Sequence, residues 1–400
     1  MEVLVMQNLE RAVQIMDREE LDGIIASSLP NLLYLSGFWD ANSFVFPYDT
    51  IRNAVASKNN LSQPILIVGQ GDLDLTTDLE NISDTVGIGA FSRYISDDVE
   101  LTPSELLLKT RAIDLEGERN QVDALCKTIQ MAGLSGRVGL DQQGINFKIE
   151  DLRAKLPNLE IVSASKVFSE IRMIKTASEI AKLKAAVVVT EESLLGGINQ
   201  LKEGTSEWEL ERNIRMEMVS RDAIPTFVQV KFGRNGGFEQ RARNDVLLKQ
   251  GDTIWVDLGC MLDGYCSDIA RTFSIGQPTD KVQTIYDALL AGETAALEFS
   301  RPGVTAKDVF NTTIESVREA GLPDYYKQHV GHGIGVETYD PPLLSPNDDT
   351  VLEANMVLDI EPPIYILGLG AFHVEDTFVI TEDGTQLLTS IDRSLQVVNI

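Results

Sequence analysis

Residues 253–273 read TIWVDLGCMLDGYCSDIARTF, which places a strand, a tight turn and a second strand in one stretch. Two runs rich in apolar residues flank Asp263-Gly264. This dipeptide suits a two-residue hairpin turn because both central residues of that turn need a positive φ. Such a turn pairs Leu262 with Tyr265. The stretch therefore predicts a β-hairpin whose register can be counted outward from the turn.

Two carboxylates fall on this hairpin. The register places Asp257 opposite Ala270 and Asp268 opposite Gly259. Because residues two apart on a strand share a face, both aspartates point the same way as diagonal neighbours. Two carboxylates held together between apolar flanks repel each other, and a metal cation would relieve that repulsion. For this pair taken alone, two exposed strand aspartates are the alternative interpretation.

Three more polar side chains stand in unusual contexts further along the chain. His332 lies among alternating glycines in HVGHGIG (329–335). Glycines let the backbone approach neighbouring segments closely, and a histidine between them has few side chains to pack against. Glu361 lies at the end of a strand in MVLDIEPPIY, which two prolines must terminate. Glu375 lies in the alternating run FHVEDTFVIT, where a buried glutamate needs a partner.

Together these side chains form a hard, oxygen-rich donor set. Four carboxylates and one imidazole suit Mn²⁺, Co²⁺, Fe²⁺ or Zn²⁺ and do not suit a structural thiolate zinc site. Two ions fit the set better than one, because two metals that share carboxylates can lower the pKa of a common water and polarise a carbonyl at once. The predicted metal ligands are Asp257, Asp268, His332, Glu361 and Glu375.

The bulk composition bounds the class of protein. A chain of 400 residues with 43% apolar residues exceeds what one hydrophobic core usually serves, so we expect two domains. A net charge of -27 repels nucleic acid and anionic membranes, and no apolar run approaches the length of a membrane span. The three cysteines are irregularly spaced, and we expect the two that flank the hairpin to be buried inert thiols. The absence of a disulfide framework and of a signal-peptide pattern at the start indicates a cytoplasmic protein.

The patterning divides the chain into two parts. Residues 1–165 mix helical patterns with short apolar strands such as GIIAS, PILIVG, RVGLD and LEIVSAS, while PNLLYLSGF reads as a turn into another short apolar segment. A long helical pattern then runs over residues 167–195, with Thr176 or Ser178 as its possible N-cap. The remainder reads as a helix, a strand-rich centre, two helices and a strand-rich end. We expect an α/β domain over 1–165 and an α+β domain over 166–400.

The order of these motifs resembles the pita-bread metallohydrolases, a family that includes Xaa-Pro aminopeptidase, prolidase, methionine aminopeptidase and creatinase. The resemblance rests on VDLG, SDIART, GHGIG, IEPP and VEDT, which carry the five ligands in order. PNLLYLSGF and IRMIKTASEI are similar to the creatinase-type N-terminal domain and to the start of its catalytic domain, so the resemblance covers the whole chain. It implies a creatinase-like α/β domain followed by a pita-bread α+β catalytic domain, as in two-domain Xaa-Pro peptidase-like members.

The resemblance also implies a role for each ligand. Asp257 would chelate one metal, Asp268 and Glu375 would bridge both metals, and His332 and Glu361 would hold the other. Glu361 would in addition be the acid and base for the bridging water. Manganese is the first choice of metal, with cobalt, zinc or iron as alternatives.

Two-domain members of the family are usually homodimers in which the partner's N-terminal domain lines the active site. The aromatic residues Phe38, Trp39 and Tyr48 stand where such a lining loop would be. Ordinary core or surface aromatics are the alternative interpretation of all three.

Three positions depart from the peptidase members of the family. A histidine before the first ligand strand is replaced by Gln240 or Arg241 in GRNGGFEQRARND, and a second one after GHGIG is replaced by Tyr339 in GVETYDPP. An arginine two residues before the last glutamate is replaced by His373. In contrast, His329 matches a family histidine that usually contacts substrate.

The chemistry of three residues at or near these positions suggests roles in substrate binding and catalysis. Arg241 and Arg243 could hold an anionic group of the substrate, or they could form surface ion pairs on an acidic protein. Tyr339 can donate a hydrogen bond to a developing oxyanion, although it does not shuttle protons near neutral pH.

The first hypothesis is a dinuclear-metal hydrolase that uses a metal-bridging water to cleave an amide or peptide C–N bond, with Xaa-Pro dipeptidase or aminopeptidase P-like activity. Because the usual peptidase histidines are replaced, a non-peptidase amidohydrolase or lyase acting on a small molecule, in the manner of creatinase or ectoine hydrolase, is the alternative. A catalytically silent binding protein that keeps metal for stability is a third hypothesis. The predicted catalytic residues are Glu361, His329 and Tyr339, and the predicted substrate-binding residues are Gln240, Arg241 and His373.

Overall fold

The structure is a computed structural model that describes residues 8–39, 51–238 and 241–400. The chain splits into two compact units, residues 1–172 and residues 173–400. The domain boundary expected between residues 165 and 166 lies at the start of helix α7 (Ser165–Met173), whose end coincides with the division between the units. No helix in the described part of the chain is both long and apolar enough to cross a membrane.

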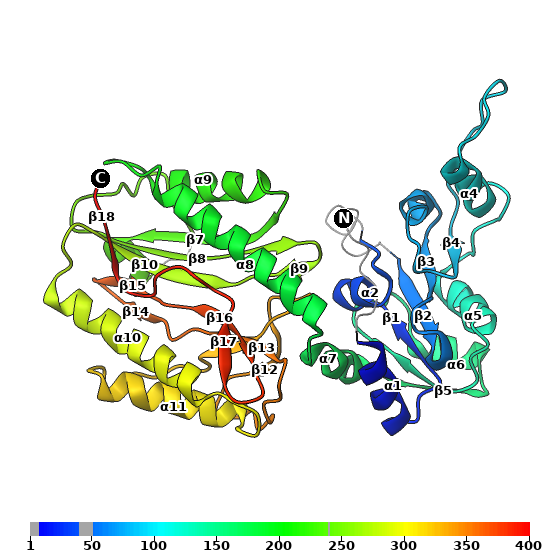
Figure 1. Cartoon of the computed structure of the whole chain (residues 1–400). Coiled ribbons are helices and arrows are strands. Elements are labelled where there is room, and N and C mark those ends of the chain that lie inside the picture. The colour runs from blue at the N-terminus through cyan, green and yellow to red at the C-terminus, as the bar shows by residue number, and fades with distance from the viewer. Residues whose placement is uncertain (1–7, 40–50, 239–240) are drawn as a thin grey trace. The chain divides into compact units, whose positions relative to one another are not determined.

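The first unit is built on a six-stranded mixed sheet surrounded by helices (Figure 1). Its strands are β1 (Gly23–Ala26), β2 (Asn53–Ser57), β3 (Ile65–Gly69), β4 (Asp84–Ile88), β5 (Gly136–Leu140) and β6 (Leu159–Ser163). Its helices are α1 (Leu9–Arg18), α2 (Leu29–Ser36), α4 (Pro103–Ala112), α5 (Gln121–Met131) and α6 (Ile149–Lys155). The strand order is β4-β3-β2-β1-β5-β6, and the buried apolar runs of β1 and β3 are typical of a sheet covered on both faces. The expected α/β architecture is confirmed.

One segment of this unit differs from the sequence prediction. PNLLYLSGF forms most of the helix α2 and not a turn into an extended segment. Pro30 in the first turn and Gly37, whose φ of 70° ends the helix, are local signals for it. The start of the helix is completed from far along the chain, because Asp141 Oδ2 accepts hydrogen bonds from the Ser28 N–H at 2.9 Å and from Asn31 Nδ2 at 2.7 Å.

The long helical pattern over residues 167–195 is two helices. α7 ends at Met173, and α8 (Ala177–Ile198) begins after a short break. The Thr176 side chain accepts from the Glu179 N–H, while the Glu179 carboxylate accepts from the Thr176 N–H at 2.7 Å. This reciprocal capping box identifies Thr176 as the N-cap and fixes where α8 starts.

The second unit holds two main sheets and three further long helices. The helices are α9 (Glu207–Val219), α10 (Asp280–Phe299) and α11 (Ala306–Glu319), and the short helix η3 covers Gly233–Gly237. The strands of the first sheet are β7 (Ile224–Phe232), β8 (Thr253–Leu262), β9 (Tyr265–Cys266), β10 (Ile269–Ile275) and β18 (Gln396–Val398). Those of the second are β11 (Gly331–Gly333), β12 (Asp340–Leu343), β13 (Val357–Ile360), β16 (Asp376–Ile380) and β17 (Thr385–Leu387), and β14 (Ile364–Ile366) pairs with β15 (Gly370–Phe372).

The sheets of this unit lie between two layers of helices (Figure 1). α8 and α9 pack on β8 and β7, and their shared core includes Leu210, Ile214 and Val256. On the other side α10 and α11 pack together against the second sheet, around Leu289 and Phe378. Because both outer faces are filled by apolar side chains, the polar residues between the two sheets are the ones left to form a site.

Candidate metal centre

The β8–β10 hairpin forms as the sequence predicts. Its turn residues Asp263 and Gly264 have φ values of 47° and 83°, both positive as a two-residue turn requires. Asp257 pairs with Ala270, so the register counted from the turn is confirmed. Asp268 lies directly before β10, where the ladder is interrupted.

The second sheet supplies the other predicted ligands. His332 is the central residue of β11 and pairs with Asp359 of β13. Glu361 follows β13 directly, and Glu375 directly precedes β16. The Glu375 N–H donates to the Ala270 carbonyl at 3.1 Å, which ties this sheet to the hairpin at the level of Asp257.

Glycines allow β11 to lie this close to its neighbours. A Cβ at Gly331 would be 2.1 Å from the Asp359 carbonyl oxygen, and one at Gly333 would be 2.4 Å from the Pro341 carbonyl oxygen. No larger residue fits at either position without moving the backbone. The close approach inferred from the GHG sequence is confirmed.

Four of the five predicted ligands line one pocket, and the fifth, His332, lies beside them. His332 Nε2 is 3.7 Å from Asp268 Oδ2 and 3.6 Å from Glu361 Oε1. One ligand atom each from Asp268, His332 and Glu375 lies within 4.8 Å of the others. Asp257 lines the same pocket, of about 350 Å³, together with Asp268, Glu361 and Glu375. The structure therefore brings together residues that are up to 118 positions apart in the chain.

The electrostatics of this cluster demand a counter-charge. Burial raises the pKa of Asp257 to about 8. Burial, and after it repulsion from neighbouring carboxylates, raises the pKa of Asp268 and Glu375 well above its usual range. Asp268 Oδ1 and Glu375 Oε2 are buried and have no hydrogen-bond partner among the described residues. Buried carboxylate oxygens that repel one another and lack donors fit divalent cations.

The tautomer of His332 also suits metal coordination. Its Nδ1 is 3.0 Å from the Gly333 carbonyl oxygen, which can only accept, so Nδ1 carries the proton. Nε2 therefore presents a lone pair to the carboxylates, and it has no hydrogen-bond partner in the described part of the chain.

Sequence reasoning missed Asp359, a fully buried aspartate beside His332. Its Oδ2 is 3.8 Å from His332 Nδ1, and burial raises its pKa well above the usual range. It also groups with Asp268, His332 and Glu375 as a possible ligand. The available signal was alternation, because Asp359 and Glu361 are two apart in VLDIE and share a face.

Two of the predicted catalytic residues contact the third. His329 Nδ1 is 3.3 Å from Glu361 Oε1, and the Tyr339 hydroxyl donates to the same oxygen at 3.4 Å. The Tyr339 ring stacks on the His332 ring with 3.6 Å between centroids. Burial alone would raise the pKa of Glu361, but the His329 imidazole 3.3 Å away and the other nearby imidazoles outweigh burial and hold that pKa below its ordinary value.

His373 lies deep in the site and is neutral. Its Nδ1 accepts a hydrogen bond from Trp255 Nε1–H at 3.4 Å, so the proton of the neutral ring is on Nε2. That Nε2 faces Glu361 Oε2 and Glu375 Oε2, each at 3.8 Å. Burial lowers the pKa of His373 to about 3. Two imidazoles thus face the cluster differently: His332 presents a lone pair and His373 presents an N–H.

Of the other residues considered for substrate binding, the described ones, Arg241 and Arg243, do not line this pocket. Gln240 lies outside the described residues. Arg241 is exposed, and the pocket lining formed by the described residues does not include it. Arg243 makes an ion pair with Asp245 at 2.6 Å, the surface interpretation that the sequence had left open. Lys327, which the sequence did not single out, lines the pocket instead.

Comparison with known proteins supports a shared ancestry. The model of metallopeptidase family M24 matches residues 181–382. The chain is 30% identical to an Xaa-Pro dipeptidase of Pyrococcus furiosus over 280 residues, which are 69% of this chain and 78% of that protein. It is 26% identical to an Xaa-Pro dipeptidase of Pyrococcus horikoshii over 393 residues, 97% of this chain and 98% of that one.

A solved structure extends the similarity to the whole fold. The prolidase from Pyrococcus horikoshii superposes with a TM-score of 0.76 at 24% identity, covering 97% of this chain and 99% of that one. At this identity the similarity shows only the fold, in which an N-terminal domain precedes a pita-bread domain in the sequence. The relatives favour a peptidase over the small-molecule amidohydrolase or lyase that the replaced histidines had suggested. The chain therefore belongs to metallopeptidase family M24 and is a metal-dependent hydrolase with the two-domain, prolidase-like architecture.

Proposed function

We propose that this enzyme hydrolyses the amide bond of Xaa-Pro dipeptides with two divalent metal ions held by Asp257, Asp268, His332, Glu361 and Glu375. The observation that carries the proposal is the clustering of these side chains, from two sheets, at one pocket, with carboxylate oxygens that lack donors among the described residues. When bound, the ions would lower the pKa of a shared water and polarise the scissile carbonyl. Among the alternatives, the oxygen-rich donor set favours manganese.

Glu361 and the residues around it would accept the proton that the attacking water loses. Its lowered pKa keeps it a carboxylate, so it can accept a proton from the attacking water. Both His329 and Tyr339 reach Glu361 Oε1, so they can hold the carboxylate in place. The Tyr339 hydroxyl is also placed to donate to a developing oxyanion.

The substrate class comes from the relatives, two of which are named Xaa-Pro dipeptidases. A cytoplasmic location is supported by Cys126, Cys260 and Cys266, none of which forms a disulfide. Burial raises the pKa of Cys266 to about 12, which agrees with the inert thiol expected there.

A homodimer is proposed from the family resemblance. Of the three aromatics expected to line a partner's site, Phe38 is buried in its own unit, Trp39 is half-buried and Tyr48 lies outside the described residues. For Phe38 the core interpretation therefore holds. Light scattering on the purified chain would decide the oligomeric state.

The test is hydrolysis of Xaa-Pro dipeptides by chelator-treated protein to which Mn²⁺ is restored. Glu361→Gln should lower kcat by roughly 10²- to 10⁴-fold, because it removes the proton acceptor. Glu382→Gln, an exposed carboxylate outside the site, is the matched control and should retain activity. No turnover of any Xaa-Pro dipeptide by the metal-loaded wild type would refute the substrate assignment.

A further inference from the structure

Lys327 is the cation of the catalytic pocket. Among the described residues that line the pocket, it is the one lysine or arginine, and it shares the lining with the carboxylates of Asp257, Glu361 and Glu375. It also lines an adjoining pocket of about 450 Å³. The side chain therefore stands where the metal cluster's pocket opens into a second hollow.

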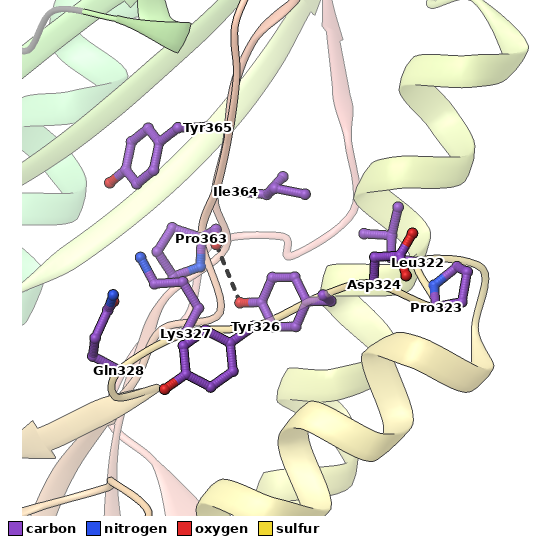
Figure 2. A pocket seen from close by; sticks show the side chains of 10 residues that line it. Leu322, Pro323, Asp324, Tyr326, Lys327, Gln328, Pro363, Ile364 and Tyr365 are labelled. Atoms are coloured by element: carbon purple, nitrogen blue, oxygen red, sulfur yellow. Dashed lines mark hydrogen bonds between the residues drawn. The ribbon is translucent and has the colours of Figure 1, made fainter.

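The position of Lys327 is set by its neighbours. Figure 2 shows its side chain running toward Pro363 and Tyr365, on the strand segment that follows Glu361. Its ammonium lies 5.2 Å from the centroid of the Tyr365 ring. The Tyr325 hydroxyl donates to the Pro363 carbonyl at 3.1 Å and so ties the segment before Lys327 to the same strand. The ammonium therefore lies at the pocket, against the Tyr365 ring.

The charge of Lys327 is not balanced by a neighbouring carboxylate in the described part of the chain. Its ammonium makes no ion pair within 4.0 Å there, whereas the fully buried Lys231 is paired with Glu207. Burial lowers its pKa, and the charge of Glu361 acts in the opposite direction. A half-buried ammonium without a partner, beside carboxylates that divalent cations would neutralise, is a site suited to an anionic group of a ligand.

Other positions that could hold such a group are already committed. His373 is neutral and receives the Trp255 N–H at its Nδ1. Arg243 is paired with Asp245. Arg241 does not line the pocket formed by the described residues. Among the described residues that line the pocket, Lys327 therefore remains as the lysine or arginine available to a carboxylate that enters it.

We propose that Lys327 binds the C-terminal carboxylate of the substrate and so restricts the enzyme to short peptides with a free C-terminus. The adjoining pocket, walled by Leu322, Ile364 and Tyr365, takes the side chain of the C-terminal residue. This assignment rests on the proposed dipeptidase function and adds to it the residue that determines specificity. It places the carboxylate on one side of the scissile bond and the metal-held carbonyl on the other.

The experiment compares Ala-Pro with Ala-Pro amide, which differ only in the C-terminal charge. The readout is the ratio of kcat/KM for the acid to that for the amide, measured with the full chain loaded with Mn²⁺. A charge-assisted contact to a carboxylate predicts a wild-type ratio of roughly 10- to 100-fold. Lys327→Met keeps the packing of the lysine stem and should bring the ratio close to one, while Lys327→Arg should retain most of it.

The control is Lys281→Met, an exposed lysine in the first turn of α10, which should keep the wild-type ratio. Melting curves check that the variants fold. A wild type that cleaves acid and amide equally, or a Lys327→Met variant that keeps the preference, would overturn the assignment while leaving the dipeptidase function intact.

If the wild type cleaves neither compound, the dipeptidase function fails by itself. Calorimetric binding of proline and prolinamide to the metal-loaded chain then decides the role of Lys327. Tighter binding of proline that is lost in Lys327→Met supports the carboxylate site. Equal binding of the two compounds, or no binding of either, overturns it.

Discussion

Replacing Lys231 with methionine should destabilise the catalytic unit by about 3–5 kcal/mol. Lys231 and Glu207 are both fully buried, with Nζ and Oε2 2.9 Å apart. The carboxylate of Glu207 also accepts hydrogen bonds from the Phe232 N–H at 2.8 Å, the Arg243 N–H at 3.1 Å and Asn235 Nδ2 at 2.9 Å. This cluster fixes the segment that runs from β7 through η3.

The magnitude follows from burial and from what the substitution leaves behind. Methionine has nearly the volume of the lysine stem, so the loss is electrostatic and not a cavity. Removing one partner of a buried ion pair costs about 3–5 kcal/mol. Because three neutral donors still reach Glu207, we expect a loss of about 3 kcal/mol. For a unit of this size that lowers the Tm by about 6–12 °C.

A double-mutant cycle tests the reasoning by thermal and urea unfolding of the chelator-treated protein. Glu207→Gln should cost a similar amount, because it leaves the ammonium of Lys231 buried without a counter-charge. The double variant should lose about 1–3 kcal/mol less than the sum of the single variants. Lys249→Met, at an exposed position, is the control. Strictly additive losses, or a Lys231→Met protein as stable as the wild type, would refute an energetic coupling of this pair.

Three further predictions concern the site. Tyr339→Phe removes the hydroxyl that donates to Glu361 and should lower kcat by roughly 100-fold with little change in KM. Tyr339→Ala should in addition weaken metal binding, measured by metal titration, because the tyrosine ring stacks on His332. Equal metal affinity in both variants would contradict this role of the ring. Gly237→Ala puts a Cβ 2.3 Å from a carbonyl oxygen of β14 and should raise KM and lower the Tm. A Cβ at Gly384 meets no atom within 4 Å, so the control variant Gly384→Ala should behave as wild type. Burial raises the folded-state pKa of Asp257 from 3.8 to about 8, so between these pH values the metal-free folded state binds more protons than the unfolded state and loses stability as the pH rises. In chelator, the Tm of Asp257→Asn minus that of the wild type should therefore increase between pH 5 and pH 8. A constant difference would contradict the raised pKa.

Much of the metal centre was accessible from local sequence. The turn at Asp263-Gly264 set the hairpin register, because a positive φ at two successive residues selects one type of turn and side chains alternate with a period of two. The glycines around His332 and the prolines after Glu361 likewise marked where strands approach closely or end. Such features depend on backbone conformation within a few residues.

The rest depended on contacts between distant segments. The cap that Asp141 provides to α2, the pairing of Lys231 with Glu207 and the place of Lys327 in the catalytic pocket join residues that no periodicity relates. The protonated nitrogen of His373 is likewise chosen by Trp255, which lies 118 positions earlier. The sequence by itself indicated five side chains that could hold metal and missed Asp359, because ligand chemistry and strand alternation are local properties. Only the tertiary structure decided which cation faces the substrate, because that depends on which charges packing leaves without a partner.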